Sequence, residues 1–219
     1  MHIKPNDLVL EIGSGNNPHP RADILCDRYL ADNRDRAGGF AAVVDRPFIV
    51  ADGEKLPFRA KQFDYVICSH VLEHIKNPKR FITELTRVGK NGFIEVPSIM
   101  SERIFGWAIH HWYINRSGGR LRLWRKKEGE GFGGLFHRLI AGEIWFRRFF
   151  EEHEAVWYVR LEWSDTIDIR VSKHSISPRI LATYDLGAEK LLESVSPSLW
   201  ADTLFYSRWM MTRLMRKTI

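Results

Sequence analysis

The sequence predicts an α/β fold built on a mostly parallel sheet. Short apolar runs recur along the first hundred residues, and loops or a helical pattern separate them. Several runs end in an acidic residue or a glycine turn, which is typical of parallel strands whose carboxyl ends bind a ligand. The 219-residue chain is long enough for one domain with an inserted segment and a substantial hydrophobic core. Its content of 44% hydrophobic and 27% charged residues is ordinary for a globular protein.

The first expected strand, at about 8–12, runs directly into the turn Gly13-Ser14-Gly15. Its apolar positions around Glu11 indicate a buried strand, and glycines at the turn let the backbone approach a ligand closely. The following segment, 16–20, contains two prolines and two asparagines, which favour turns over a long helix. We therefore expect only a very short helix or a loop before the second strand.

Four further strands are expected in the first hundred residues, with one helix between them. The helix is predicted at about 79–88, where Phe81, Ile82, Leu85 and Val88 recur at three- and four-residue steps. The strands are expected at 22–27, 47–53, 63–69 and, after an Asn91-Gly92 turn, 93–97. If these strands are parallel, groups at their carboxyl ends converge on one edge: Gly13, Gly15, Asp27, Asp52, Gly53, Ser69 and His70.

Three stretches, in this order, resemble motifs of the class I S-adenosylmethionine-dependent methyltransferases. They are Glu-Ile-Gly-Ser-Gly at 11–15, Ile-Val-Ala-Asp-Gly-Glu-Lys-Leu-Pro-Phe at 49–58, and Phe-Asp-Tyr-Val-Ile-Cys-Ser-His-Val-Leu-Glu-His-Ile at 63–75. The third is similar to the fourth-strand motif of the small-molecule, type 11-like branch. The resemblance covers about the first hundred residues, and several ordered motifs are more specific than one Gly-x-Gly. It implies a Rossmann-like fold and a methyltransferase that uses S-adenosylmethionine.

The resemblance also implies which residues bind the cofactor. Gly13 and Gly15, with Ser14 between them, would let the backbone pass the methionine moiety, and Glu11 would orient its amino group. Asp27 would accept hydrogen bonds from the two ribose hydroxyls, because a carboxylate can accept both. The adenine amino group would be bound by Asp52, with the Gly53 amide nearby.

The resemblance also implies that Ser69 and His70 belong to the cofactor-binding residues, close to the reacting methyl group. Methyl transfer is mainly a positioning task, but an acceptor that must lose a proton needs a base, and histidine is suited to that role near neutral pH. By position His70 is the first candidate for a catalytic residue. The cap histidines rank lower: His110, His111 and His137.

Two other site classes are disfavoured by the same residues. A dinucleotide fingerprint needs a third glycine opening a helix, but Pro18 stands at that position, and no Walker loop occurs. His70, Glu73 and His74 follow an inverted zinc-binding order, although a further ligand would be needed. Because this segment resembles the methyltransferase motif, we expect no metal.

The second part of the chain differs in character from the first. Residues 98–219 carry 19 Lys/Arg against 14 Asp/Glu, and all eight tryptophans follow residue 100. We expect a helical, aromatic cap insertion at about 98–154, including one helix from 135 to about 153. A terminal antiparallel strand pair should follow at 155–163 and 166–172. The methyltransferase domain would then span 1–175, and 176–219 would form a C-terminal helical extension.

These observations predict a cytoplasmic enzyme that methylates a small molecule at oxygen, nitrogen or carbon. The N-terminus lacks an apolar signal segment, and Cys26 and Cys68 fit buried thiols. The basic, aromatic second part suggests a phosphorylated, sugar or lipid-linked acceptor. A non-catalytic methyltransferase-like interaction module and an RNA methyltransferase remain alternatives. A nucleic-acid partner is disfavoured, because the sequence contains no recognisable RNA-binding module. An amphipathic helix from about 202 would allow peripheral membrane contact, or packing in a homo-oligomer.

Overall fold

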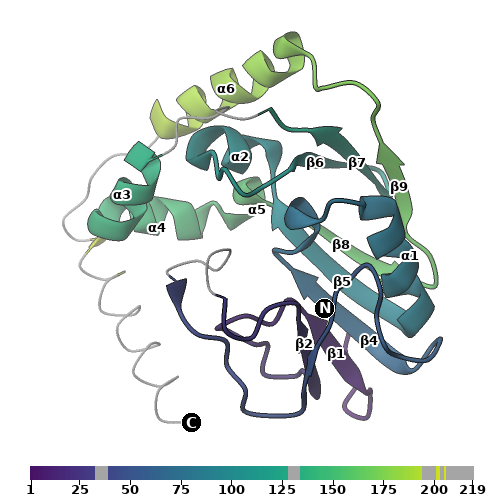
Figure 1. Ribbon diagram of the computed structural model, residues 1–219. Helices are drawn as coiled ribbons and strands as arrows, with labels where there is room; N and C mark the ends of the chain where they lie inside the picture. Colours follow the sequence, from purple (N-terminus) through teal and green to yellow (C-terminus); the bar gives the residue numbers. More distant parts are fainter. Residues whose placement is uncertain (33–38, 128–133, 194–200, 203–204, 206–219) are drawn as a thin grey trace. The chain divides into compact units, whose positions relative to one another are not determined.

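The computed structural model describes residues 1–32, 39–127, 134–193, 201–202 and 205 (Figure 1). The chain divides into two compact units, each built from discontinuous segments. The first unit contains residues 1–98, 108–128 and 158–176, and the second contains 99–107, 129–157 and 177–219. Both sheets lie in the first unit, and it also contains every residue predicted to bind the cofactor.

A six-stranded sheet forms the centre of the first unit, in the order β3-β2-β1-β4-β5-β8. All neighbouring strands are parallel except the last pair, β5 and β8. The predicted α/β fold with a mostly parallel sheet is confirmed. The strands are β1 (Val9–Ile12), β2 (Ile24–Asp27), β3 (Phe48–Val50), β4 (Phe63–Ser69), β5 (Gly89–Pro97) and β8 (Tyr158–Ser164).

Turns and bends, with no helix, connect β1 to β2, as the two prolines predict. Two arginines stabilise this connection by donating to backbone carbonyls. The guanidinium of Arg46 donates to His19, Pro20 and Ala22 at 3.2, 3.4 and 2.7 Å. Arg21 binds the carbonyls of the N-terminal segment 4–7 in the same way. Arg46 therefore satisfies carbonyls of the connection that a helix would pair internally, whereas Arg21 ties the connection to the segment before β1.

Helix α1 (Pro78–Val88) packs its apolar stripe into the core, and Asn77 caps it by accepting from the Arg80 N–H. The same helix holds the loop after β3. Glu84 accepts from the N–H of Leu56, and Arg87 donates to the carbonyls of Leu56 and Phe58. This pairing fixes the loop that begins with Asp52 and Gly53.

The predicted turn at Asn91-Gly92 is wrong, because both residues lie inside β5. They pair with Tyr65 and Val66 of β4 on one side and with Ser164 and Trp163 of β8 on the other. A Cβ at Gly92 would lie 2.6 Å from the indole of Trp163. Gly92 therefore provides space for the packed tryptophan and does not turn the chain.

A second sheet of three strands corrects two expectations about the cap and the end of the domain. Its strands are β6 (Trp112–Ser117), β7 (Arg120–Arg125) and β9 (Asp168–Val171). The basic segment within the expected helical cap is thus a β6–β7 hairpin. In the expected terminal pair, β8 takes its antiparallel place beside β5, but β9 leaves the central sheet and pairs in parallel with β7. The buried Leu121 and Leu123 and the half-buried Ile169 explain this pairing, because all three join the main core.

The second unit is helical and rich in packed aromatic rings. The expected single helix over 135–153 is interrupted at Glu143, which has extended backbone between α3 and α4. Phe150 stacks on Trp157 with ring centroids 5.0 Å apart, and Arg103 of α2 pairs with Asp185 of α6 at 2.8 Å. The helices are α2 (Ile99–Phe105), α3 (Gly134–Gly142), α4 (Ile144–Glu152), α5 (Glu154–Trp157) and α6 (Pro178–Glu193).

Helix α6 lies within the segment 176–219, whose role as a C-terminal helical extension remains a prediction. The amphipathic helix expected from about 202 lies almost entirely outside the described residues, so its predicted contacts remain predictions. Among the helices that the structure describes, none combines the length and the apolar character that a membrane crossing requires.

Candidate functional site

Backbone hydrogen bonds connect the carboxyl ends of three neighbouring strands. The N–H of Gly13, after β1, donates to the carbonyl of Cys26 in β2 at 2.7 Å. The N–H of Gly15 donates to Oδ2 of Asp27 at 3.1 Å. The carbonyl of Asp27 in turn accepts from Ala51, after β3, at 3.0 Å. The structure therefore brings the glycine turn, Asp27 and the Asp52 loop together at one sheet edge, as the sequence predicts.

The glycine turn has a conformation and an environment that require glycine at its first position. Gly13 and Gly15 have φ of +73° and +51°. A Cβ on Gly13 would lie 2.1 Å from Cγ2 of Val71, so this glycine is needed for packing. Ser14 between them is only 4% exposed, and its hydroxyl has no hydrogen-bond partner among the described residues. A buried hydroxyl without a protein partner is suited to binding a ligand atom.

Glu11 lies beneath this turn and is buried. Its Oε2 accepts a hydrogen bond from the N–H of His19 at 2.7 Å. Burial raises the pKa of the Glu11 carboxyl to about 7, although the His19 hydrogen bond and the charge of Arg46 oppose that rise. A cationic group placed beside Glu11 would favour its ionised form.

Asp27 and Asp52 each use a carboxylate oxygen to order their own loop. Oδ1 of Asp27 accepts from the N–H of Tyr29 at 3.0 Å, and Oδ1 of Asp52 accepts from that of Glu54 at 2.8 Å. Arg28 lies 3.6 Å from Oδ2 of Asp52. Each carboxylate oxygen accepts more than one hydrogen bond, so this ordering leaves capacity for ligand donors.

Gly53 has a packing requirement of its own. A Cβ at this position would lie 2.5 Å from the ring of Phe81, which is fully buried on α1. Glycine therefore lets the loop after Asp52 pack directly on the helix, whatever the loop binds.

His70 follows Ser69 at the end of β4 in a left-handed conformation, with φ of +56°. Its N–H donates to the carbonyl of Glu95 at 2.9 Å. The imidazole lies between two carboxylates: Nδ1 is 3.5 Å from Glu73 and Nε2 is 3.6 Å from Glu95. The ring also meets Tyr158 edge-on, with centroids 5.3 Å apart, and the side chain remains 46% exposed.

Opposing effects act on the proton affinity of His70. Partial burial lowers its pKa, but the interaction with Glu73 and the negative charges of Glu73 and Glu95 outweigh that effect, so the pKa is raised. Arg160 moderates the rise, and it pairs with Glu95 at 2.5 Å. The arrangement stabilises an imidazolium at the end of β4.

Two of the lower-ranked histidines, His110 and His137, lie in different units of the structure. His110 lies beside His74, with ring centroids 4.5 Å apart, whereas Nε2 of His137 lies 3.0 Å from the carbonyl of Phe105 in the second unit. Sequence reasoning missed the positions of Glu95 and Arg46, because neither belongs to a motif. Glu95 has a weak signal: it is an acidic residue in an otherwise apolar strand.

Residues 25–94 match a protein-family model described as a methyltransferase domain. Among curated proteins, an uncharacterized protein of Methanocaldococcus jannaschii is 48% identical over 44 residues, which are 20% of this chain and 22% of that protein. A demethylmenaquinone methyltransferase of Renibacterium salmoninarum is 32% identical over 109 residues, or 47% of this chain and 45% of that protein. The chain thus spans less than half the length of either relative.

The solved structures that match part of the chain include a possible histamine N-methyltransferase of Thermotoga maritima. It has a TM-score of 0.36 and 15% identity, and the match covers 45% of this chain and 48% of that one. The family match over residues 25–94 confirms the resemblance of this part of the chain to class I methyltransferases. That stretch includes Asp27, Asp52 and His70, so the carboxyl ends of β2, β3 and β4 lie within the matched residues.

Proposed function

We propose that this protein transfers a methyl group from S-adenosylmethionine to a small-molecule acceptor. The observation that carries the proposal is the linkage of the glycine turn, Asp27 and the Asp52 loop at one edge of the parallel sheet, with His70 at the next strand end. Parallel α/β sheets bind ligands at this edge. The family match over residues 25–94 supports the same reading.

The residues present fit S-adenosylmethionine. The buried hydroxyl of Ser14 has no partner among the described residues, so a ligand atom would satisfy it. Glu11 would attract the ammonium group, Asp27 would accept from the ribose hydroxyls, and Asp52 would accept from the adenine amino group. When bound, the cofactor supplies an electrophilic methyl group on a sulfonium sulfur.

The chain's own residues would position the acceptor and receive its proton. His70 would accept that proton on a ring nitrogen, and Glu73 and Glu95 would stabilise the resulting imidazolium and fix the ring's orientation. Tyr158, packed edge-on against the ring, would limit its rotation. Since methyl transfer needs an in-line approach, a fixed ring contributes mainly through geometry.

Calorimetric titration with S-adenosylhomocysteine tests the cofactor site directly. We expect saturable binding at one site per chain, weakened in Asp27→Ala. Asp168→Ala is the matched control, because it removes an exposed carboxylate from β9 in the second sheet. Absence of binding, or equal binding by both variants, would contradict the proposal.

Activity and binding measurements on the same purified protein distinguish the other candidate functions. Cofactor binding without turnover of any small-molecule pool would favour a methyltransferase-like interaction module. Methylation of RNA with steeply salt-dependent binding would favour an RNA substrate. We further propose that the acceptor is a phosphorylated, sugar or lipid-linked metabolite. A peripheral membrane contact and a homo-oligomeric contact are proposals of the same kind.

A further inference from the structure

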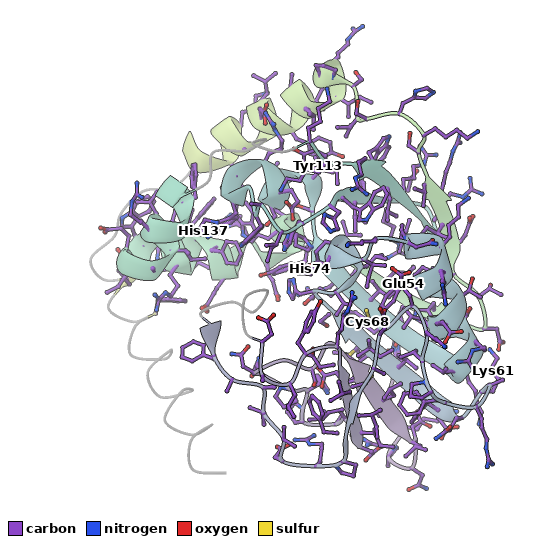
Figure 2. The ribbon with its side chains drawn as sticks, in the orientation of Figure 1. Glu54, Lys61, Cys68, His74, Tyr113 and His137 are labelled. Atoms are coloured by element: carbon purple, nitrogen blue, oxygen red, sulfur yellow. The ribbon has the colours of Figure 1, made fainter. Side chains whose placement is uncertain are left out.

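Glu73, His74 and His110 come together beside the one-turn helix η2 (Leu72–His74), and Figure 2 labels His74 there. Each offers one ligand atom, and these atoms all lie within 4.8 Å of one another. The rings of His74 and His110 are nearly perpendicular, with an interplanar angle of 86°.

The carboxylate of Glu73 requires a positive partner. Glu73 is only 1% exposed, and neither of its carboxylate oxygens has a hydrogen-bond partner within the described part of the chain. His70 approaches Oε1 to 3.5 Å, which is an ion-pair contact longer than a hydrogen bond. Burying an ionised carboxylate without full compensation is costly, and coordination to a metal is one of the arrangements that removes the cost.

Backbone contacts hold the two ligand-bearing segments against each other. The N–H of His111 donates to the carbonyl of Glu73 at 2.8 Å. The indole N–H of Trp112 donates to the carbonyl of Ile75 at 2.6 Å. Each contact joins a neighbour of His110 to η2 or to the residue that follows it. The cluster is therefore set by the fold of the first unit and not by two mobile side chains meeting by chance.

We propose that Glu73, His74 and His110 bind one divalent cation of the zinc class. Two imidazoles and one carboxylate form a ligand set that suits zinc, and they leave a fourth position for water or an exogenous ligand. Magnesium and calcium are disfavoured because they prefer oxygen ligands. Metal–ligand bonds of about 2.0–2.2 Å require the three side chains to close slightly around the ion.

The sequence led us to expect no metal, and the inverted order of His70, Glu73 and His74 still needed a further ligand. The structure supplies that ligand from His110, which lies on a distant segment. The proposal does not rest on methyl transfer, since none of the three side chains is assigned to the cofactor. Glu73 also lies 3.5 Å from His70, so the site is tested by metal binding and not by turnover. The cation would tie η2, directly after the β4 site, to the segment that enters β6.

Metal titration of chelator-treated protein tests the site. Calorimetry with Zn²⁺ and visible absorption with Co²⁺ should report one ion per chain, and cobalt should show the intense bands of four-coordinate geometry. Glu73→Gln and His110→Gln should each weaken binding at least 100-fold. His111→Gln is the matched control, because it removes the neighbouring imidazole, which lies outside the cluster, and should leave binding unchanged.

Folding is checked separately, by thermal unfolding with and without Zn²⁺. Wild type and His111→Gln should unfold at higher temperature with the metal, whereas Glu73→Gln and His110→Gln should not respond. If a variant does not fold, His74→Gln replaces it, since His74 is less buried. Equal affinity in all variants, or no stoichiometric binding by wild type, would overturn the proposal.

Discussion

Oδ2 of Asp27 accepts a hydrogen bond from the N–H of Gly15 at 3.1 Å, so the acidic residue that ends β2 holds the glycine turn after β1. The same carboxylate also orders the chain at Tyr29 through its other oxygen. Asp27 therefore shapes the site as well as offering oxygens to a ligand. This double role separates the predicted effects of its two simplest substitutions.

Asp27→Ala should weaken S-adenosylhomocysteine binding more than Asp27→Asn does. Alanine removes both the ligand acceptors and the support of Gly15, whereas asparagine keeps one acceptor oxygen. Hydrogen bonds to a charged group contribute about 1.5–3 kcal/mol, so we expect a loss of roughly 10- to 100-fold or more for alanine. Calorimetric titration of the two variants measures the difference. If both variants bound S-adenosylhomocysteine with the affinity of the wild type, Asp27 would not contact the ligand.

Gly13→Ala should destabilise the protein by about 3 kcal/mol or more, because its Cβ would lie 2.1 Å from Val71 and its φ is +73°. Val71→Ala should relieve the steric part of this cost but not the backbone strain. The double variant should thus be more stable than the sum of the single effects implies. Urea unfolding of the wild type, the two single variants and the double variant measures this difference as a double-mutant cycle. Strict additivity would show that the two residues do not clash.

Arg46→Gln should lower the free energy of unfolding by about 1–3 kcal/mol, since three carbonyls of the β1–β2 connection lose their donor. Arg59→Gln removes an exposed guanidinium and should change stability by less than about 0.5 kcal/mol. Denaturant unfolding compares them. A similar small effect for both would mean that the loop does not depend on Arg46.

The Glu11 carboxyl should make stability decrease as pH rises through the window from about 4.5 to about 7. Its pKa is raised from 4.5 to about 7, so the folded state binds more protons than the unfolded state in that window. The contribution, about 3 kcal/mol at most, is present below pH 4.5 and lost above pH 7.

Glu11→Gln should remove this dependence, and the difference between the two unfolding profiles measures it. The difference is needed because the lowered pKa of His19 acts in the opposite direction, and Arg46 keeps its charge throughout. Parallel profiles for wild type and variant would contradict the raised pKa.

His70→Gln should lower methyl-transfer turnover by about 10²- to 10⁴-fold if the acceptor must lose a proton. Affinity for S-adenosylhomocysteine should change little, because His70 acts on the acceptor side of the site. Steady-state kinetics with a responsive acceptor, together with calorimetry, separate the two effects. A parallel loss of affinity and turnover would assign His70 to cofactor binding instead.

Local patterns predicted most of the central sheet and helix α1. Strand β4, strand β2 and helix α1 follow from apolar runs and helical periodicity, and Pro18 and Pro20 correctly predict that no long helix connects β1 to β2. The order of acids and glycines at strand ends also predicted their convergence, because parallel strands place their carboxyl ends at one edge. These features depend on residues close together in sequence.

Tertiary structure decided the features that depend on distant partners. Asn91-Gly92 has the composition of a turn, yet it forms part of β5 because Val66 and Trp163 pair and pack on it. Strand β9 joins β7 since the second sheet buries its apolar face there.

The same distinction applies at the candidate site. Sequence alone predicted strand β1, the glycine turn and the acid at the end of β2, since each is encoded within a few residues. Only the tertiary structure showed that Val71 requires Gly13, that Arg46 replaces a helix's internal hydrogen bonds, and that His110 meets Glu73. Contacts of this kind join segments far apart in the chain, and no local pattern encodes which side chains the fold brings together.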